Sequence, residues 1–181
     1  MNFISFEYII FMVISLSLFF KIEQKFKPHV LLILSLLFYG YQGINFLFLI
    51  VTLITFSYYS GIILSRLNNH RLLYFSLSCV VVLSFLFFFK YYNFFLNQIN
   101  LTFFSEEKFS LINIILPLGI SFYSFQIIGY LTDVYRKKKR VEKNFVKYSL
   151  FISFFPQLVS GPIERGKNLI PQFSFSYNRN K

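Results

Sequence analysis

Residues 30–64 read VLLILSLLFYGYQGINFLFLIVTLITFSYYSGIIL and contain no charged side chain. A helix needs roughly 20 residues to cross the hydrocarbon core of a bilayer, so this stretch is too long for one membrane helix. It breaks naturally at residues 40–45, GYQGIN, because two glycines and two amides in succession are typical of a turn. The stretch therefore predicts a short membrane helix and an ordinary one, joined by a tight connection.

Four further stretches are apolar and free of charge, and they lie at residues 8–20, 72–89, 109–132 and 148–163. The first is long enough to span a membrane only when residues 3–7 are added. It does not resemble a signal peptide, because no Lys or Arg precedes it and no small-residue cleavage site follows. Together the stretches predict an all-α integral membrane protein with about six membrane helices, some of them short, broken or re-entrant.

The composition excludes an ordinary soluble domain. Hydrophobic residues make up 56% of the 181 residues and charged residues only 14%, whereas soluble domains are about 25% charged. The formal net charge is +11. Because the basic residues flank long apolar runs, we expect them to meet membrane lipids and to set orientation, and we expect no nucleic-acid partner. A single cysteine and two histidines offer no metal-ligating spacing, so no metal is expected.

The positive charges fall almost entirely into alternate loops. Twelve Lys and Arg residues lie on one side of an alternating topology: Lys21, Lys25, Lys27, Arg66, Arg71, Arg136, Lys137, Lys138, Lys139, Arg140, Lys143 and Lys147. Only Lys90 and Lys108 lie on the other side. By the positive-inside rule this predicts a multi-pass protein of the bacterial cytoplasmic membrane with its N-terminus outside. Residues 91–105, rich in Phe and Tyr, would then form an interfacial aromatic layer outside.

The last two apolar stretches are interrupted by proline, which removes a helix hydrogen bond. Residues 116–136 read LPLGISFYSFQIIGYLTDVYR, and residues 154–165 read FFPQLVSGPIER. Irregular backbone at membrane depth survives only when it is buried in protein or lines a cavity. The second stretch is also short of a full crossing, which favours a tilted element or a re-entrant one with its break at Pro156.

These two blocks resemble the membrane-bound O-acyltransferase family in order and spacing. The resemblance is to the bacterial branch that includes the alginate O-acetylation protein and the D-alanyl transfer protein of teichoic acid modification. The sequence FYG at residues 38–40 and the run FKYYNF at residues 89–94 also fit that branch. The resemblance implies that residues 1–181 are the N-terminal portion of one polytopic acyltransferase domain, whose catalytic C-terminal part is absent.

The resemblance implies transfer of an acyl group, acetyl or a related one, from a cytoplasmic thioester to an extracytoplasmic polysaccharide. The donor would be acetyl-CoA or an acyl carrier protein, no cofactor would be bound, and an extracytoplasmic transferase would act as partner. The family's catalytic histidine lies on a later segment. His29 and His70 match no such motif and are expected in solvated loops, so no catalytic residue is assigned, and the isolated chain is expected to be inactive.

The candidate tunnel or motif residues are Pro117, Gly119, Ser121, Tyr123, Gln126, Asp133, Arg136, Pro156, Gly161, Pro162 and Arg165. The prolines and glycines could equally be packing and turn residues, which are common in membrane helices. Asp133 could form an interfacial ion pair with Arg136 or contact substrate. Arg165 could bind a phosphate or carboxylate group of a substrate, or lipid headgroups. The run from Arg136 to Arg140 could control topology or dock an acidic donor carrier.

Two other interpretations remain open. A membrane transporter or assembly subunit would use broken helices around a midplane site, but the sequence has no internal repeat with paired breaks. A truncated remnant without activity is also compatible with the polar ending SYNRNK.

Overall fold

The computed structural model describes residues 6–103, 112–138, 140–160 and 164–174, and within these ranges every regular element is a helix. The all-α prediction is therefore confirmed for the described residues. Helices α1 (Phe6–Lys21), α2 (Lys27–Gln42) and α3 (Ile44–Arg66) follow one another, with a short 3₁₀ turn, η1 (Gln24–Phe26), between the first two.

The turn predicted within residues 40–45 is confirmed and very tight. Only Gly43 separates α2 from α3, and its φ of 143° lies outside the range that a residue with a Cβ readily adopts. The Gly43 N–H donates to the Gly40 carbonyl at 3.1 Å, and the Phe46 N–H donates to the Gly43 carbonyl at 3.1 Å. These bonds satisfy part of both helix ends.

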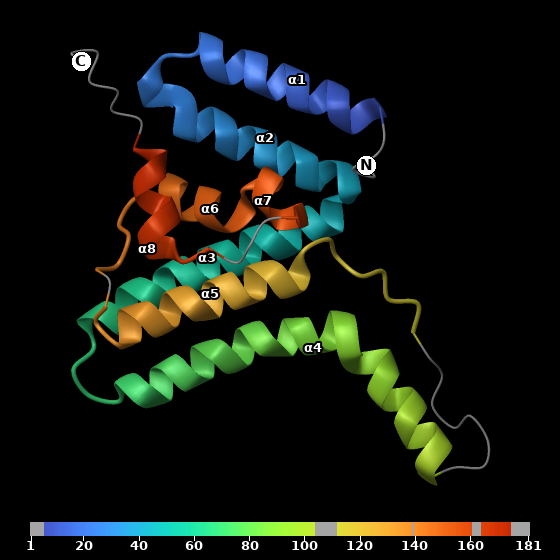
Figure 1. The fold of residues 1–181 in the computed structure, drawn as a ribbon. Helices are drawn as coiled ribbons and strands as arrows, with labels where there is room; N and C mark the ends of the chain where they lie inside the picture. The colour runs from blue at the N-terminus through green and yellow to red at the C-terminus, as the bar shows by residue number, and fades with distance from the viewer. Residues whose placement is uncertain (1–5, 104–111, 139, 161–163, 175–181) are drawn as a thin grey trace.

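Helix α4 (Arg71–Phe103) is longer than the predicted span at residues 72–89. It continues through residues 91–103, so the residues predicted to form an external aromatic layer are helical, and their position outside the membrane stays a prediction. Figure 1 shows that the C-terminal part of α4 bends away from the other helices. Its exposed aromatic side chains, among them Phe94 (58% exposed), are nevertheless suited to an interfacial environment.

Helix α5 (Ile120–Tyr135) begins later than the apolar stretch 109–132 predicted. Residues 112–117 have no regular structure, because Pro117 cannot donate a helix hydrogen bond and Gly119, at φ 70°, forms the left-handed N-cap. Asn93 of α4 ties this segment down, since its side-chain amide donates to the Ile112 carbonyl at 2.6 Å and accepts from the Ile112 N–H at 3.2 Å.

The final apolar stretch is divided into two short helices, α6 (Phe145–Ser153) and α7 (Phe155–Ser160). The interruption predicted at Pro156 is therefore confirmed, although it falls at Phe154 and Pro156 lies inside the first turn of α7. Every side chain of α6 from Tyr148 to Ser153 is buried. A short helix α8 (Gly166–Leu169) and a 3₁₀ turn η2 (Ile170–Phe173) complete the described chain.

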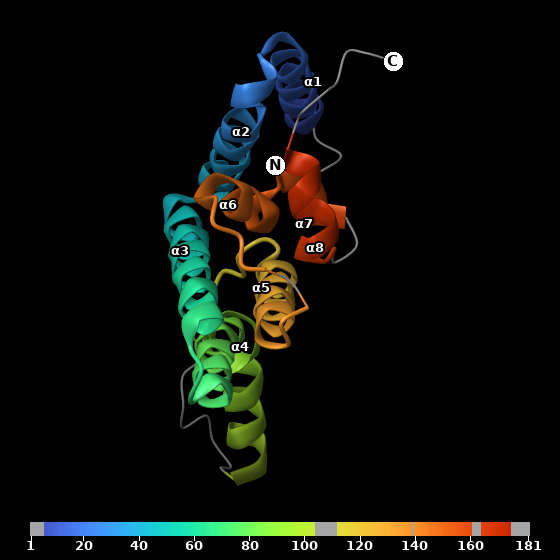
Figure 2. The ribbon, with the colours of Figure 1, turned by 90° about the vertical axis from the view of Figure 1, so that its left-hand side faces the viewer.

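The helices lie side by side in an elongated stack whose outermost helices are α1 and α4 (Figures 1 and 2). The buried helix α6 packs against α2, α3 and α5, and α5 in turn packs against α3 and α4. Among the described residues, α3 and residues 71–102 of α4 are the two helices long and apolar enough to cross a membrane. Their length and composition favour a membrane protein, but a count of six membrane helices is not confirmed.

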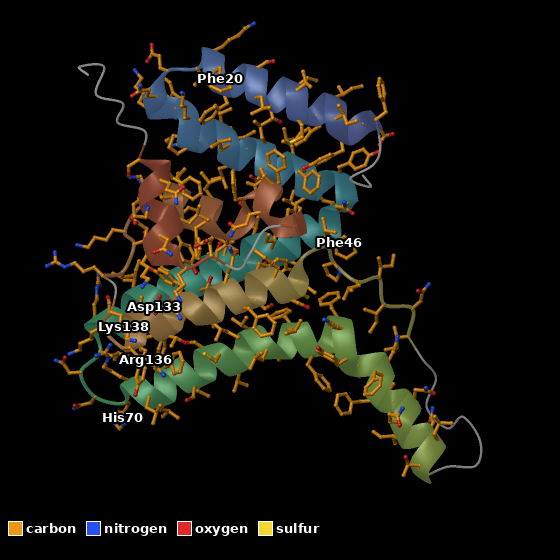
Figure 3. All side chains as sticks on the ribbon, viewed as in Figure 1. Phe20, Phe46, His70, Asp133, Arg136 and Lys138 are labelled. Atoms are coloured by element: carbon orange, nitrogen blue, oxygen red, sulfur yellow. The ribbon has the colours of Figure 1, made fainter. Side chains whose placement is uncertain are left out.

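Successive long helices run in alternate directions, so the basic loops gather on one side of the stack, where α1, α3 and α5 end. This side is called the end of the stack that holds the basic loops. Figure 3 shows His70, Arg136 and Lys138 together at that end and Phe46, near the start of α3, at the other. The ends of α1 and α3 contribute Lys21 and Arg66 to the same side. The one-sided charge distribution is thus a property of the fold, whereas the orientation of the chain in a membrane stays a prediction.

Gly61 of α3 provides a test of the packing between α3 and α5. A Cβ at Gly61 would lie 2.9 Å from Cε1 of the buried Tyr130, closer than real Cβ contacts come. We expect Gly61→Ala to lower the free energy of unfolding by about 1–3 kcal/mol through overpacking. Gly129→Ala is the matched control, because its Cβ would meet nothing within 4 Å and alanine favours a helix by up to about 1 kcal/mol. Thermal unfolding in detergent would measure both, and equal stability of the two variants would contradict this packing.

Candidate functional site

The Pro117–Gly119 turn, the first part of the acyltransferase-like block, is held against α2 by a tyrosine. The Tyr39 hydroxyl donates to the Leu118 carbonyl at 2.8 Å. Tyr39 is fully buried and Pro117 is buried as well. The sequence correctly predicted an interruption here, and the structure shows that Tyr39 of α2 holds this turn in place with one hydrogen bond. Pro117 and Gly119 therefore have an evident structural role, as the packing interpretation proposed.

The N-terminal half of α5 carries polar groups that are buried without a hydrogen-bond partner in the described part of the chain. These groups are the Tyr123 hydroxyl, the Ser124 hydroxyl and both amide atoms of Gln126. All three side chains are at most 2% exposed. A buried polar group without a partner costs about 1–3 kcal/mol, so native proteins seldom keep several together. Such an accumulation marks this half of α5 as the candidate site.

Ser121, one turn earlier, has a different environment. Its hydroxyl accepts a hydrogen bond from Lys90 Nζ at 3.1 Å. Lys90 lies within α4 and not in the outer loop to which the charge pattern assigned it. Ser121 thus faces α4, and the structure does not place it with the unpartnered groups of α5.

Asp133 and Arg136 lie at the opposite end of α5 from Tyr123. Asp133 is 7% exposed, whereas Arg136 is exposed. The described residues show no ion pair between them, so the predicted interfacial pair is not observed. Gln126 and Asp133 are seven residues apart, which places them on nearly the same face of α5 but about 10 Å apart along its axis. Asp133 therefore does not join the buried Tyr123 and Gln126 groups.

Pro156 lines an apolar pocket of about 280 Å³ between α1, α2, α7 and η2. Ser15, Leu31 and Phe173 also line it, and the Ser15 hydroxyl is buried without a hydrogen-bond partner in the described residues. Arg165 is exposed and caps the start of α8. Gly161 and Pro162, also candidates, lie outside the described residues.

A cluster of tyrosines that the sequence analysis did not single out fills the interior between α3, α5 and α6. The Tyr148 hydroxyl donates to Ser57 Oγ at 2.7 Å, and Tyr58 donates to the Lys143 carbonyl at 2.6 Å. Tyr130 accepts from the Glu142 N–H at 2.9 Å. Because these bonds fix the connection between α5 and α6, the cluster is structural. Its members are spread over 91 residues of sequence, so no local spacing could have identified it.

The buried groups could bind or orient a polar substrate, but they supply no general base. Hydroxyl and amide groups can donate hydrogen bonds to a carbonyl or an oxyanion. His29 is exposed in the first turn of α2, and His70 is exposed just before α4, so both are solvated as expected. No group of three or more His, Cys, Asp or Glu residues within the described ranges could hold a metal ion.

Tyr39 and Tyr123 form a matched pair for testing these assignments. Their ring centroids are 6.4 Å apart and both are fully buried, but only Tyr39 has a hydrogen-bond partner for its hydroxyl. We expect Tyr39→Phe to lower the free energy of unfolding by about 1 kcal/mol. Tyr123→Phe should leave stability unchanged or raise it. Chemical unfolding in detergent would compare them, and a larger loss in Tyr123→Phe would refute the unpartnered assignment.

Comparison with known proteins places these observations in a family. The chain is 34% identical over 173 residues to a Pseudomonas aeruginosa protein named "Probable alginate O-acetylase", with 91% of this chain and 33% of that protein covered. It is also 34% identical to the Azotobacter vinelandii protein of that name, over 91% of this chain and 34% of the relative. The Helicobacter pylori "Peptidoglycan O-acetyltransferase" matches at 34% identity, with 82% and 33% covered.

The chain thus spans about one third of the length of the curated relatives it matches. No protein-family profile and no solved structure matches it. The relatives nevertheless match 91% and 82% of this chain, and they bear out the predicted resemblance. This chain belongs to the membrane-bound O-acyltransferase family, in the bacterial branch that holds these O-acetylases and the peptidoglycan O-acetyltransferase.

Proposed function

We propose that this chain is the N-terminal portion of a bacterial O-acetyltransferase that transfers an acetyl group from a cytoplasmic thioester to a cell-envelope polymer. The observation that carries the proposal is the 34% identity over 91% of the chain to a protein named for O-acetylation of alginate. The name of the peptidoglycan O-acetyltransferase supports a polymer acceptor outside the cytoplasm.

The reaction needs three things from the enzyme. A base must remove the proton of the acceptor hydroxyl, polar donors must stabilise the oxyanion that forms at the thioester carbonyl, and water must be excluded. Attack by the acceptor oxygen forms the ester bond and releases the donor's thiolate, which the removed proton neutralises. We propose that residues outside this chain supply the base, and that the isolated chain is inactive.

The chain itself would supply walls and hydrogen-bond donors. Gln126 and Tyr123 support this role, because each holds a buried donor that the described residues leave unused. A substrate carbonyl or hydroxyl would provide the missing partner. The same low-dielectric surroundings that make an unpartnered amide costly would strengthen its bond to a substrate.

The proposed reaction also implies where in the cell the protein lies and which molecules it contacts. Acetyl-CoA or an acyl carrier protein would approach the end of the stack that holds the basic loops, which would face the cytoplasm with the N-terminus outside. The polymer would be reached from the opposite face, through an extracytoplasmic transferase partner. The protein would reside in the cytoplasmic membrane.

Deletion of the gene tests the proposal directly. Envelope polymers from deleted and parental cells would be purified, and ester-linked acetate would be released with mild base and quantified. We expect the acetate content of one polymer to fall to background and to return when the intact gene is restored. Unchanged acetate in every polymer would overturn the proposal and favour a transporter, an assembly subunit or an inactive remnant.

Gln126→Met in the intact gene separates a functional from a structural role of the amide. Methionine has a similar volume and no unsatisfied amide, so the variant should be as stable as the parent or more stable. We expect polymer-bound acetate to fall about a hundredfold or more, as when a single oxyanion donor is removed. Gln98→Met, on an exposed position of α4, is the control and should change neither quantity. A destabilised Gln126→Met protein would instead mean that the amide is structural.

A further inference from the structure

Basic side chains from the start of α4 and from the connection between α5 and α6 line an open cavity where α3 ends and α4 begins. The cavity has a volume of about 620 Å³ and is lined by Arg71, Lys137, Arg140 and Lys143, with Glu142 as its acidic residue. A neighbouring cavity of about 450 Å³ shares Lys143 with it and adds Arg66. Four cationic side chains thus line one open cavity beside a single carboxylate, with Arg66 in the neighbouring cavity, and this arrangement favours an anionic ligand.

Arg71 is held in a fixed orientation in this cavity. Its Nη2 donates to the Val134 carbonyl at 3.3 Å and to the Tyr135 carbonyl at 3.0 Å, and its guanidinium lies 5.7 Å from the centre of the Tyr135 ring. Its Nε is buried and makes no hydrogen bond within the described residues. An oriented guanidinium is suited to an oxyanion such as phosphate.

Lys137 occupies a backbone position at which glycine would fit better. The Lys137 N–H donates to the Val134 carbonyl at 3.1 Å, and the Lys138 N–H donates to the Asp133 carbonyl at 2.9 Å. These bonds form a Schellman motif that ends α5, with Lys137 in the left-handed conformation at φ 55°. Residues with a Cβ adopt this conformation at a penalty that glycine avoids. Backbone strain of this kind is often stored at functional sites, and here its side chain lines the cavity.

Control of membrane topology does not require these features. The positive-inside rule depends on the number of Lys and Arg residues in a loop, and it requires neither a shared cavity nor an oriented guanidinium. The arrangement is thus more specific than orientation in the membrane demands.

We propose that this cavity, lined by Arg71, Lys137, Arg140 and Lys143, binds the phosphate groups of a ligand at the end of the stack that holds the basic loops. Two sources share that chemistry: the phosphates of a soluble nucleotide thioester donor, and the headgroup of an anionic phospholipid. Only the first source rests on the proposed acetyltransfer; the site itself does not depend on it.

The experiment measures binding to the purified chain in nanodiscs of phosphatidylcholine, which has no net charge. Coenzyme A and inorganic pyrophosphate are titrated by calorimetry, and the unfolding temperature is then compared in nanodiscs containing phosphatidylglycerol. We expect the double variant Arg140→Gln/Lys143→Gln to weaken binding about tenfold or more. Lys21→Gln/Lys25→Gln is the matched control, because it removes the same charge at the same end of the stack but outside the cavity.

A third variant distinguishes a loss of ligand binding from a loss of folding. Lys137→Gly removes one cation and relieves the left-handed strain, so it should raise the unfolding temperature while weakening binding severalfold. A structural role for Lys137 would not give these opposite changes.

Each outcome assigns or rejects the site. Binding of coenzyme A that depends on Arg140 and Lys143 identifies the soluble source. Stabilisation by phosphatidylglycerol alone, with the same dependence, identifies the lipid source. No effect of either ligand, or equal losses in the cavity and control variants, would overturn the proposal. Polymer acetylation is measured separately, so failure of the phosphate site does not count against the acetyltransferase.

Discussion

Backbone groups in an apolar environment must have hydrogen-bond partners, and the architecture of this chain depends on meeting that constraint where its helices break. Backbone groups meet it at Gly43, and side chains from other helices supply partners at the later interruptions. Tyr39 of α2 donates to the turn before α5, and Ser35 of α2 accepts from the Phe155 N–H at 3.4 Å where α7 begins. Arg71 of α4 caps the last carbonyls of α5. The short helices can therefore lie in the interior of the stack without a full-length span.

The buried helix α6 packs against several of the helices that take part in these hydrogen bonds. It is only nine residues long, yet it contacts α2, α3 and α5 and buries every side chain from Tyr148 onward. Asn144 caps its first turn, accepting from the Lys147 N–H at 3.0 Å, and Tyr148 bonds Ser57 of α3. Tertiary packing rather than length stabilises such a helix, because an isolated helix this short is marginal in water.

The unpartnered groups of α5 and of the basic cavity are two of the places in the described part of the chain where buried polar atoms lack a partner, and the hydroxyls of Ser15 and Ser149 are others. Tyr123, Ser124 and Gln126 keep free polar atoms in the interior, and Arg71 keeps a free Nε at the basic end. The two regions lie at opposite ends of α5. An enzyme that meets a charged donor at one membrane face and transfers its acyl group further inside would need polar groups at two such depths.

The sequence by itself determined the helical class, the membrane setting, the turn at Gly43 and the breaks near Pro117 and Pro156, because charge-free length, glycine and proline act locally. It also identified the family and five candidates that are buried or line a pocket, namely Pro117, Tyr123, Gln126, Asp133 and Pro156. Only the tertiary structure decided that α4 continues past residue 90, that Asp133 and Arg136 do not pair, and that Arg71 joins Lys137, Arg140 and Lys143 around one cavity. Those outcomes depend on contacts between segments far apart in the chain. The apolar pattern of one segment does not specify which other segments it will contact.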